Sequence, residues 1–159
     1  MSTVRGIENA YIKTAKRGWD KVYWALDLHD TCLKATYTAN EPKSYQWISP
    51  YVKEALQRLV AHPETHLILW SSVHDAEKPH YLKFFADAGI RVSGFNHNPY
   101  ESGSASCGVG EKFYFSILVD DKAGFHPSEW LHIPDFVDQI RKTYPPVVLE
   151  TEVEASTLA

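Results

Sequence analysis

Residues 22–31 read VYWALDLHDT. The first five form a continuous apolar run of residues that favour β-strands, and the run ends abruptly at Asp27. A short apolar run bounded by polar residues is typical of a strand buried on both faces of a sheet. We therefore predict a buried strand over residues 22–26, with a carboxylate directly at its end.

Two later apolar runs repeat this arrangement. The first, LILW, ends in a pair of serines, and the second, FYFSILV, ends in a pair of aspartates. We predict that both runs are strands of the same sheet. The runs and the polar pairs after them are residues 67–70 with Ser71 and Ser72, and residues 113–119 with Asp120 and Asp121.

Apolar residues at helical spacing lie between and after these strands. Pro50 is expected in the first turn of the first helix, and Gly89 is expected to end the second. Short additional strands are predicted over residues 90–95 and 130–133. The three predicted helices span residues 48–60, 79–88 and 134–142.

Strands that alternate with helices at this spacing predict an α/β fold with a mainly parallel sheet, a Rossmann-like three-layer α/β/α sandwich. With 159 residues, of which 44% are hydrophobic, the chain has the size and composition of one globular domain. We assign that domain to residues 22–145. Residues 1–21 remain an unassigned N-terminal arm, because apolar positions there only weakly follow helical spacing, and residues 146–159 are predicted to be an acidic tail.

Composition restricts the partners and the cellular location. The net charge of −4 gives little general attraction for phosphate backbones, so nucleic acid is not favoured as a partner. No segment approaches the ~20 apolar residues of a membrane span, so no membrane association is expected. Cys32 and Cys107 form no disulfide framework, which favours a reducing, cytoplasmic location.

The polar residues at the strand ends form a candidate site. In open parallel sheets the ligand crevice lies outside the carboxyl ends of the strands, so we expect these side chains to converge. Carboxylates alone would repel a phosphate group, and the cluster therefore predicts a hard divalent cation, for which oxygen ligands favour Mg²⁺. Lys112, just before the third strand, is a candidate to reach the same crevice and add positive charge. The strand-end residues of this candidate site are Asp27, Ser71, Ser72, Asp120 and Asp121.

In motif order the chain resembles the haloacid dehalogenase superfamily of phosphatases and phosphotransferases. VYWALDLHDTCL resembles that family's first motif, with Asp27 at the nucleophile position and Thr31 at the threonine position. LILWSS resembles the second motif through Ser71, Lys112 resembles the lysine of the third, and ILVDD resembles the fourth. The resemblance covers residues 22–140, about the length of the predicted domain.

The resemblance implies an Mg²⁺-dependent phosphatase that acts through an aspartyl-phosphate intermediate on Asp27. It implies that Mg²⁺ is bound by the Asp27 carboxylate, the main chain of His29 and Asp121, with Asp120 as an orienting acid of the same metal site. It also implies that the phosphate group is bound by Ser71, Ser72, Thr31 and Lys112.

The sequence departs from the family pattern at His29, which stands where the second acid of the first motif is expected. That acid protonates the leaving group and activates water. An imidazole can exchange protons near neutral pH, so a working phosphatase and a catalytically impaired module that binds Mg²⁺ or phosphate both remain open. Asp30 stands where the family often has glycine.

These residues also have other interpretations. Asp27, Ser71 and Ser72 are also suitable as helix caps, and Lys112 as a solvated surface charge, with Lys122 as its nearest substitute. A receiver-type signalling domain uses similar residues but carries its acid pair early in the chain, whereas here the pair comes late. Neither residues 32–47 nor 96–111 are long enough for a lid domain, so an open, capless site is expected. Such a site would take a phosphorylated small molecule or macromolecule, and a homo-oligomer is a possible form.

Overall fold

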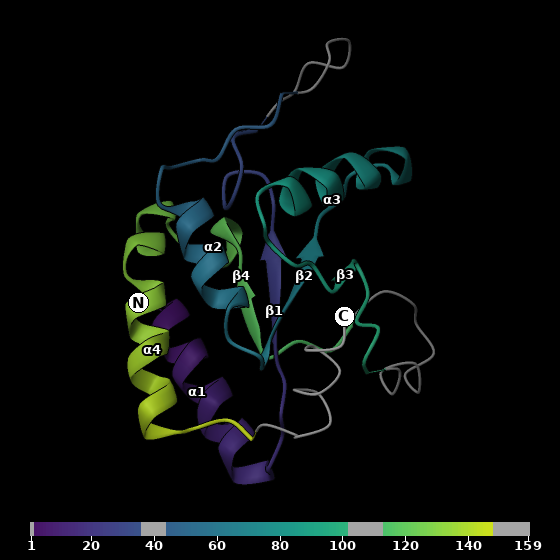
Figure 1. Ribbon diagram of the computed structural model, residues 1–159. Coiled ribbons are helices and arrows are strands. Elements are labelled where there is room, and N and C mark those ends of the chain that lie inside the picture. Colours follow the sequence, from purple (N-terminus) through teal and green to yellow (C-terminus); the bar gives the residue numbers. More distant parts are fainter. Residues whose placement is uncertain (1, 36–43, 102–112, 148–159) are drawn as a thin grey trace.

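The computed structural model describes residues 2–35, 44–101 and 113–147 (Figure 1). Its centre is a four-stranded sheet in the order β3-β2-β1-β4, in which every pairing is parallel. The predicted α/β fold with a parallel, Rossmann-like sheet is therefore confirmed. The strands are β1 (Val22–Asp27), β2 (Thr65–Trp70), β3 (Gly94–Phe95) and β4 (Ile117–Val119).

The apolar run that starts at Val22 forms the central strand. Its side chains alternate between two clusters, with Trp24 and Leu26 in the larger one and Tyr23 and Ala25 in the smaller one. Because a parallel strand inside the sheet is covered on both faces, an unbroken apolar run is stable there. The run therefore fixes both the strand and its central place in the sheet.

Helices cover the face of the sheet that carries Trp24 and Leu26. All four α-helices contribute buried side chains to the larger cluster, and α1, α2 and α4 lie together beside the sheet in Figure 1. Their apolar positions recur at helical spacing, so each helix turns one apolar stripe inward. The helices are α1 (Ser2–Arg17), α2 (Val52–Val60), α3 (Lys78–Asp87) and α4 (Ile133–Thr143).

The opposite face of the sheet differs from the predicted sandwich. Its cluster consists of Tyr23, Ala25, Ile68 and Phe113, and no side chain from a described helix joins it. The chain order explains this one-sided arrangement. β1, β2 and β3 are consecutive neighbours, and right-handed connections that step in one direction place α2 and α3 on the same face. Within the described residues, the third layer of the predicted α/β/α sandwich is therefore not formed by a helix.

The N-terminal arm, left unassigned from the sequence, forms α1 and packs into the core. Ile7 and Tyr11 are fully buried in the larger cluster. The Tyr11 hydroxyl also donates a hydrogen bond of 3.1 Å to Glu64, which in turn pairs with Arg141 of α4. Residues 2–17 therefore belong to the same core as the sheet.

Several predicted boundaries were wrong in detail. The helix predicted from residue 48 begins at Val52, so Pro50 precedes it rather than lying in its first turn. No strand forms over residues 130–133: Trp130 and Leu131 end a 3-10 helix, η4 (Pro127–Leu131), and Ile133 begins α4. Pro127 starts η4, and a hydrogen bond from the His126 N–H to Glu129 caps it. Gly89 ends α3 as predicted, with φ of +73°.

Two further expectations concern the ends of the chain and the membrane. Residues 148–159, most of the predicted acidic tail, lie outside the described residues. None of the described helices combines the length and apolar character that crossing a membrane requires.

Candidate functional site at the carboxyl ends of the strands

The strand order creates a switch point between β1 and β4. From β1 the chain steps to β2 and β3 on one side, and it then returns to place β4 on the other side. In parallel α/β sheets a crevice opens outside the carboxyl ends of the strands at such a point. Leu26 is in register with Val119, so the next residues, Asp27 and Asp120, emerge side by side at this crevice.

Three carboxylates converge there as predicted. Asp27, Asp120 and Asp121 each offer a carboxylate oxygen, and these oxygens lie within 4.8 Å of one another. All three side chains are half-buried. Asp120 precedes a short 3-10 helix, η3 (Asp121–Ala123), and accepts a 2.9 Å bond from the Lys122 N–H, so the local backbone fixes its direction.

Thr31 joins the two acidic segments. Its hydroxyl donates to Asp27 Oδ2 at 3.0 Å and accepts from the Asp121 N–H at 3.0 Å. Since Thr31 is fully buried, this hydroxyl is held in place between β1 and the segment after β4. Thr31 therefore positions the carboxylates, and its predicted contact with a phosphate group stays a prediction.

The loop after β1 is a tight turn that supports Thr31. Asp30 lies in the left-handed region with φ of 63°, which explains in physical terms why glycine suits this position. The N–H groups of Cys32 and Leu33 both donate to the Leu28 carbonyl. From η4, the indole N–H of Trp130 donates a buried 2.8 Å bond to the Thr31 carbonyl. Sequence reasoning missed this support, because Trp130 was read as part of a strand.

The electrostatics of the cluster favour a cation. The pKa of Asp27 is raised to about 7, mainly by burial and also by the negative charges of Asp120 and Asp121, while the hydrogen bond from Thr31 acts in the opposite direction. Holding three carboxylates this close costs free energy, which a divalent cation would offset. An all-oxygen, negatively charged donor set fits the requirements of Mg²⁺.

His29 lies beside helix α3. Its Nε2 lies 3.0 Å from the hydroxyl of Tyr81, and the two rings meet edge to face with centroids 5.9 Å apart. Tyr81 also packs on Tyr45, and burial raises the pKa of Tyr81 to about 12, so its hydroxyl remains protonated at neutral pH. Tyr81 lies within the helix predicted over residues 79–88, and only the tertiary structure pairs it with His29.

The serine pair follows β2 on the other side of Asp27. Asp27 is in register with Trp70 on the neighbouring strand, and adjacent strands are about 4.8 Å apart. Ser71 follows Trp70 directly, so it lies one residue beyond the level of Asp27. Asn96, just after β3, accepts from the Ser71 N–H at 2.9 Å and donates to its carbonyl at 2.7 Å, which fixes the Ser71 backbone. Ser71 is half-buried, whereas Ser72 is exposed.

The two candidate lysines differ in what the structure describes. Lys112 lies outside the described residues. Lys122 is exposed within η3, next to the acidic pair. The predicted contact of Lys112 with a phosphate group therefore stays a prediction.

No protein-family model, curated protein or solved structure matches this chain. A function has to be argued from the arrangement of the side chains themselves. That arrangement is an acidic cluster at a switch point, tied together by a buried threonine, with a serine at the neighbouring strand end.

Proposed function

We propose that this chain is an Mg²⁺-dependent phosphatase of the haloacid dehalogenase type, acting through an aspartyl-phosphate on Asp27. One observation carries the proposal. The carboxylates of Asp27, Asp120 and Asp121 converge at the switch point, and the Thr31 hydroxyl binds both Asp27 and the Asp121 backbone. A set of oxygen donors at this place in a parallel sheet suits the binding of a cation together with a phosphate group.

Mg²⁺ would be held by Asp27, Asp121 and the main chain of His29, with Asp120 beside them. When bound, the cation supplies positive charge next to the phosphate oxygens. Ser71 is suited to donate a hydrogen bond to a phosphate oxygen, because its neighbouring strand ends beside Asp27. In the proposal, Ser72 and Lys112 complete the phosphate-binding groups, and Thr31 holds the Asp27 carboxylate in place.

The reaction proceeds in two displacements. A carboxylate oxygen of Asp27 attacks phosphorus, the bond from phosphorus to the leaving-group oxygen breaks, and that oxygen takes up a proton. Water then attacks phosphorus and gives up a proton, the bond to Asp27 breaks, and phosphate leaves with the carboxylate restored. His29 is the proposed donor of the first proton and acceptor of the second, and Tyr81 would orient its ring through the 3.0 Å contact.

A panel of phosphomonoesters assayed with the full chain tests the proposal. Hydrolysis should require Mg²⁺, stop on addition of EDTA, and be abolished in Asp27→Asn, because an amide oxygen is a poor nucleophile. Asp87→Asn is the matched control, since Asp87 is an exposed aspartate at the end of α3 and pairs with Lys83. Equal turnover by Asp27→Asn and wild type would exclude the covalent mechanism.

A second candidate function is a module that binds Mg²⁺ or phosphate without turnover. The contact between the His29 ring and the Tyr81 hydroxyl favours this binding module. An imidazole nitrogen that is hydrogen-bonded to a neighbouring side chain is less suited to protonate a leaving group. His29→Asp separates the two candidates. Restoring the acid should preserve or raise turnover in an enzyme, whereas a binding module stays inactive while it still binds Mg²⁺.

A further inference from the structure

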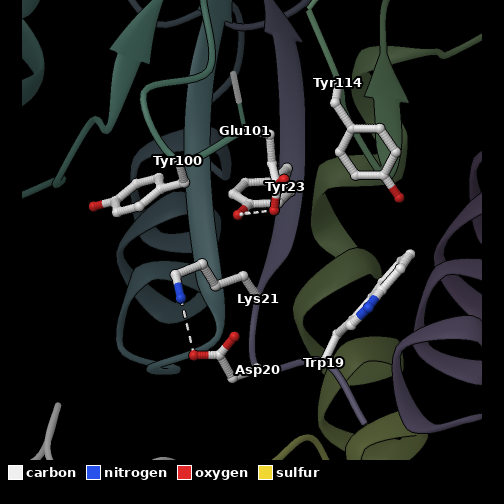
Figure 2. Close-up of a pocket in the computed structure, with 7 residues that line it drawn as sticks. All are labelled: Trp19, Asp20, Lys21, Tyr23, Tyr100, Glu101 and Tyr114. Carbon is white, nitrogen blue, oxygen red and sulfur yellow. Dashed lines mark hydrogen bonds and ion pairs between the residues drawn. The ribbon is translucent and has the colours of Figure 1, made fainter. Parts of the chain in front are cut away.

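A second cavity lies at the opposite end of β1 from Asp27, and the proposed phosphatase function does not use it. Its volume is about 510 Å³, within the range of roughly 300 to 1,000 Å³ found for small-molecule sites. Figure 2 shows that its walls come from the segment before β1, from Tyr23 of β1 and from the segments that precede β4. The lining residues are Trp19, Asp20, Lys21, Tyr23, Tyr100, Glu101 and Tyr114.

Four aromatic rings form most of the wall. Tyr114 meets both Trp19 and Tyr23 at nearly right angles, with centroids 6.3 and 6.0 Å apart. Tyr100 lies beside Tyr23 at a centroid distance of 6.2 Å with an angle of 29° between the ring planes. Trp19, Tyr100 and Tyr114 are 36%, 50% and 39% exposed, so these large rings stay open to solvent instead of completing the core.

The seven residues that line the cavity carry a net charge of −1, from Asp20, Glu101 and Lys21. Lys21 pairs with Asp20 at 2.9 Å, and these two charges cancel. Glu101 accepts a 3.1 Å bond from the Tyr23 hydroxyl, and among the described residues it forms no ion pair. Burial and the nearby Glu101 charge raise the pKa of Tyr23, which keeps that hydroxyl protonated as the donor. The result is one carboxylate, oriented by Tyr23, at the edge of a ring-lined cavity.

The rings already attract cations from within the chain. The Arg17 guanidinium lies 4.8 Å from the centre of the Trp19 ring, and the Lys21 ammonium lies 5.7 Å from the centre of the Tyr100 ring. The face of an aromatic ring carries negative potential, and it attracts a cation within about 6 Å of its centre. Ring faces combined with the negative charge of Glu101 therefore make this a site for positive charge.

We propose that this cavity binds a weakly hydrated organic cation, specifically a quaternary ammonium group, with Glu101 as its counter-charge. Ring faces cannot replace the hydrogen bonds that water makes to a primary ammonium or a metal ion. A quaternary ammonium group makes no such hydrogen bonds, so it loses little by leaving water. The cavity binds this group either as a free small molecule or as a trimethylated lysine side chain of a peptide.

Titration of the full chain by calorimetry tests this inference with two probes of the same shape. Choline carries the charge, and 3,3-dimethylbutan-1-ol replaces its nitrogen by carbon and is neutral. We expect choline to bind about ten-fold more tightly than the alcohol, since cation–π and carboxylate attraction act on the charge alone. A peptide with one trimethyllysine, compared with its unmodified form, distinguishes a protein partner from a free ligand.

Variants assign the binding to this cavity. Glu101→Gln keeps the shape and removes the charge, so it should weaken choline binding about five-fold and leave the alcohol unchanged. Tyr114→Leu should weaken both probes, while Tyr51→Leu, at a similarly exposed tyrosine outside the cavity, should weaken neither. Circular dichroism establishes that each variant is folded. Equal binding of choline and the alcohol, no binding of choline, or full choline binding by Glu101→Gln would overturn the proposal.

Discussion

At the scale of single residues, the position of the Asp27 carboxylate has an electrostatic cost. Its carboxylate is half-buried beside two others, and its pKa rises to about 7 through burial first and then through the charges of Asp120 and Asp121. A group whose pKa is raised in the folded state holds its proton more tightly there than in the unfolded chain. This residue therefore ties the stability of the fold to pH.

Asp27→Asn should stabilise the metal-free protein at high pH. The wild type loses stability as pH rises from about 4, the ordinary pKa of an aspartate, to about 7, and the loss is complete above that. An asparagine has no charge to bury, so the variant should be about 1 to 2 kcal/mol more stable at pH 8 and nearly equal to wild type at pH 4. Urea unfolding in EDTA measures both values. A variant that is less stable at pH 8 would contradict the argument.

Thr31→Val should weaken Mg²⁺ binding about ten-fold or more, because supports of a metal ligand typically contribute that much. The valine keeps the shape but removes the hydroxyl that binds Asp27 and the Asp121 backbone. It also removes the hydrogen bond that lowers the pKa of Asp27, so that carboxylate becomes harder to ionise. Calorimetric titration with Mg²⁺ checks this. Thr31→Ser keeps the hydroxyl and should retain most of the affinity.

At the scale of elements, α1, α4 and the start of β2 are joined by one buried acid. Glu64, 1% exposed, accepts from Tyr11 of α1 and pairs with Arg141 of α4. A buried carboxylate that loses its cation keeps the cost of leaving water without the compensating attraction. The junction of these three elements therefore depends on Arg141.

Arg141→Met should destabilise the protein by about 3 kcal/mol, because it leaves Glu64 buried without its cation. Arg58→Met is the matched control. Arg58 pairs with Asp135 and Asp138 at the surface, where water screens the charges, so its loss should cost less than about 1 kcal/mol. Denaturant unfolding of both variants gives the comparison. Similar losses for the two would show that burial of Glu64 does not set the cost.

Elements with a strong local signal could be predicted, and those defined by distant contacts could not. The apolar run at Val22 and the acids after the last strand have clear patterns, so three carboxylates of the site were expected to converge. The pattern of α1 is weak, and its packing depends on Glu64, more than fifty residues later. Tyr81 contacts His29, and Trp130 donates a hydrogen bond to the Thr31 carbonyl. These contacts could not be predicted, because both aromatic residues lie in apolar stretches of the sequence.

At the scale of the whole molecule, the two candidate sites lie at opposite ends of β1. Asp27 ends the strand at the acidic cluster, and the ring-lined cavity surrounds Tyr23 near its start. The hydrogen-bonded strands of the sheet separate the two sites. Ligands at the two ends should therefore bind independently.

Mg²⁺ should raise the melting temperature of the whole protein. A ligand that binds the folded state alone stabilises it by about 1.4 kcal/mol at ten times its dissociation constant. EDTA should reverse the shift, and Asp121→Asn should reduce it, because that variant loses a charged ligand of the cluster. Differential scanning calorimetry at several Mg²⁺ concentrations measures the effect. An unchanged melting temperature at 20 mM Mg²⁺ would exclude a functional metal site.

The central position of β1 has a consequence for synthesis on the ribosome. β1 is made early, but one of its two neighbours, β4, is encoded near the other end of the chain. Until that late segment emerges, one edge of the central strand has no hydrogen-bonding partner, and an unpaired apolar edge invites association with other chains. The acids after β4 arrive with the same segment, so any Mg²⁺ affinity of the cluster would be gained only after that segment has emerged. Nascent chains stalled before residue 117 should depend most on chaperones.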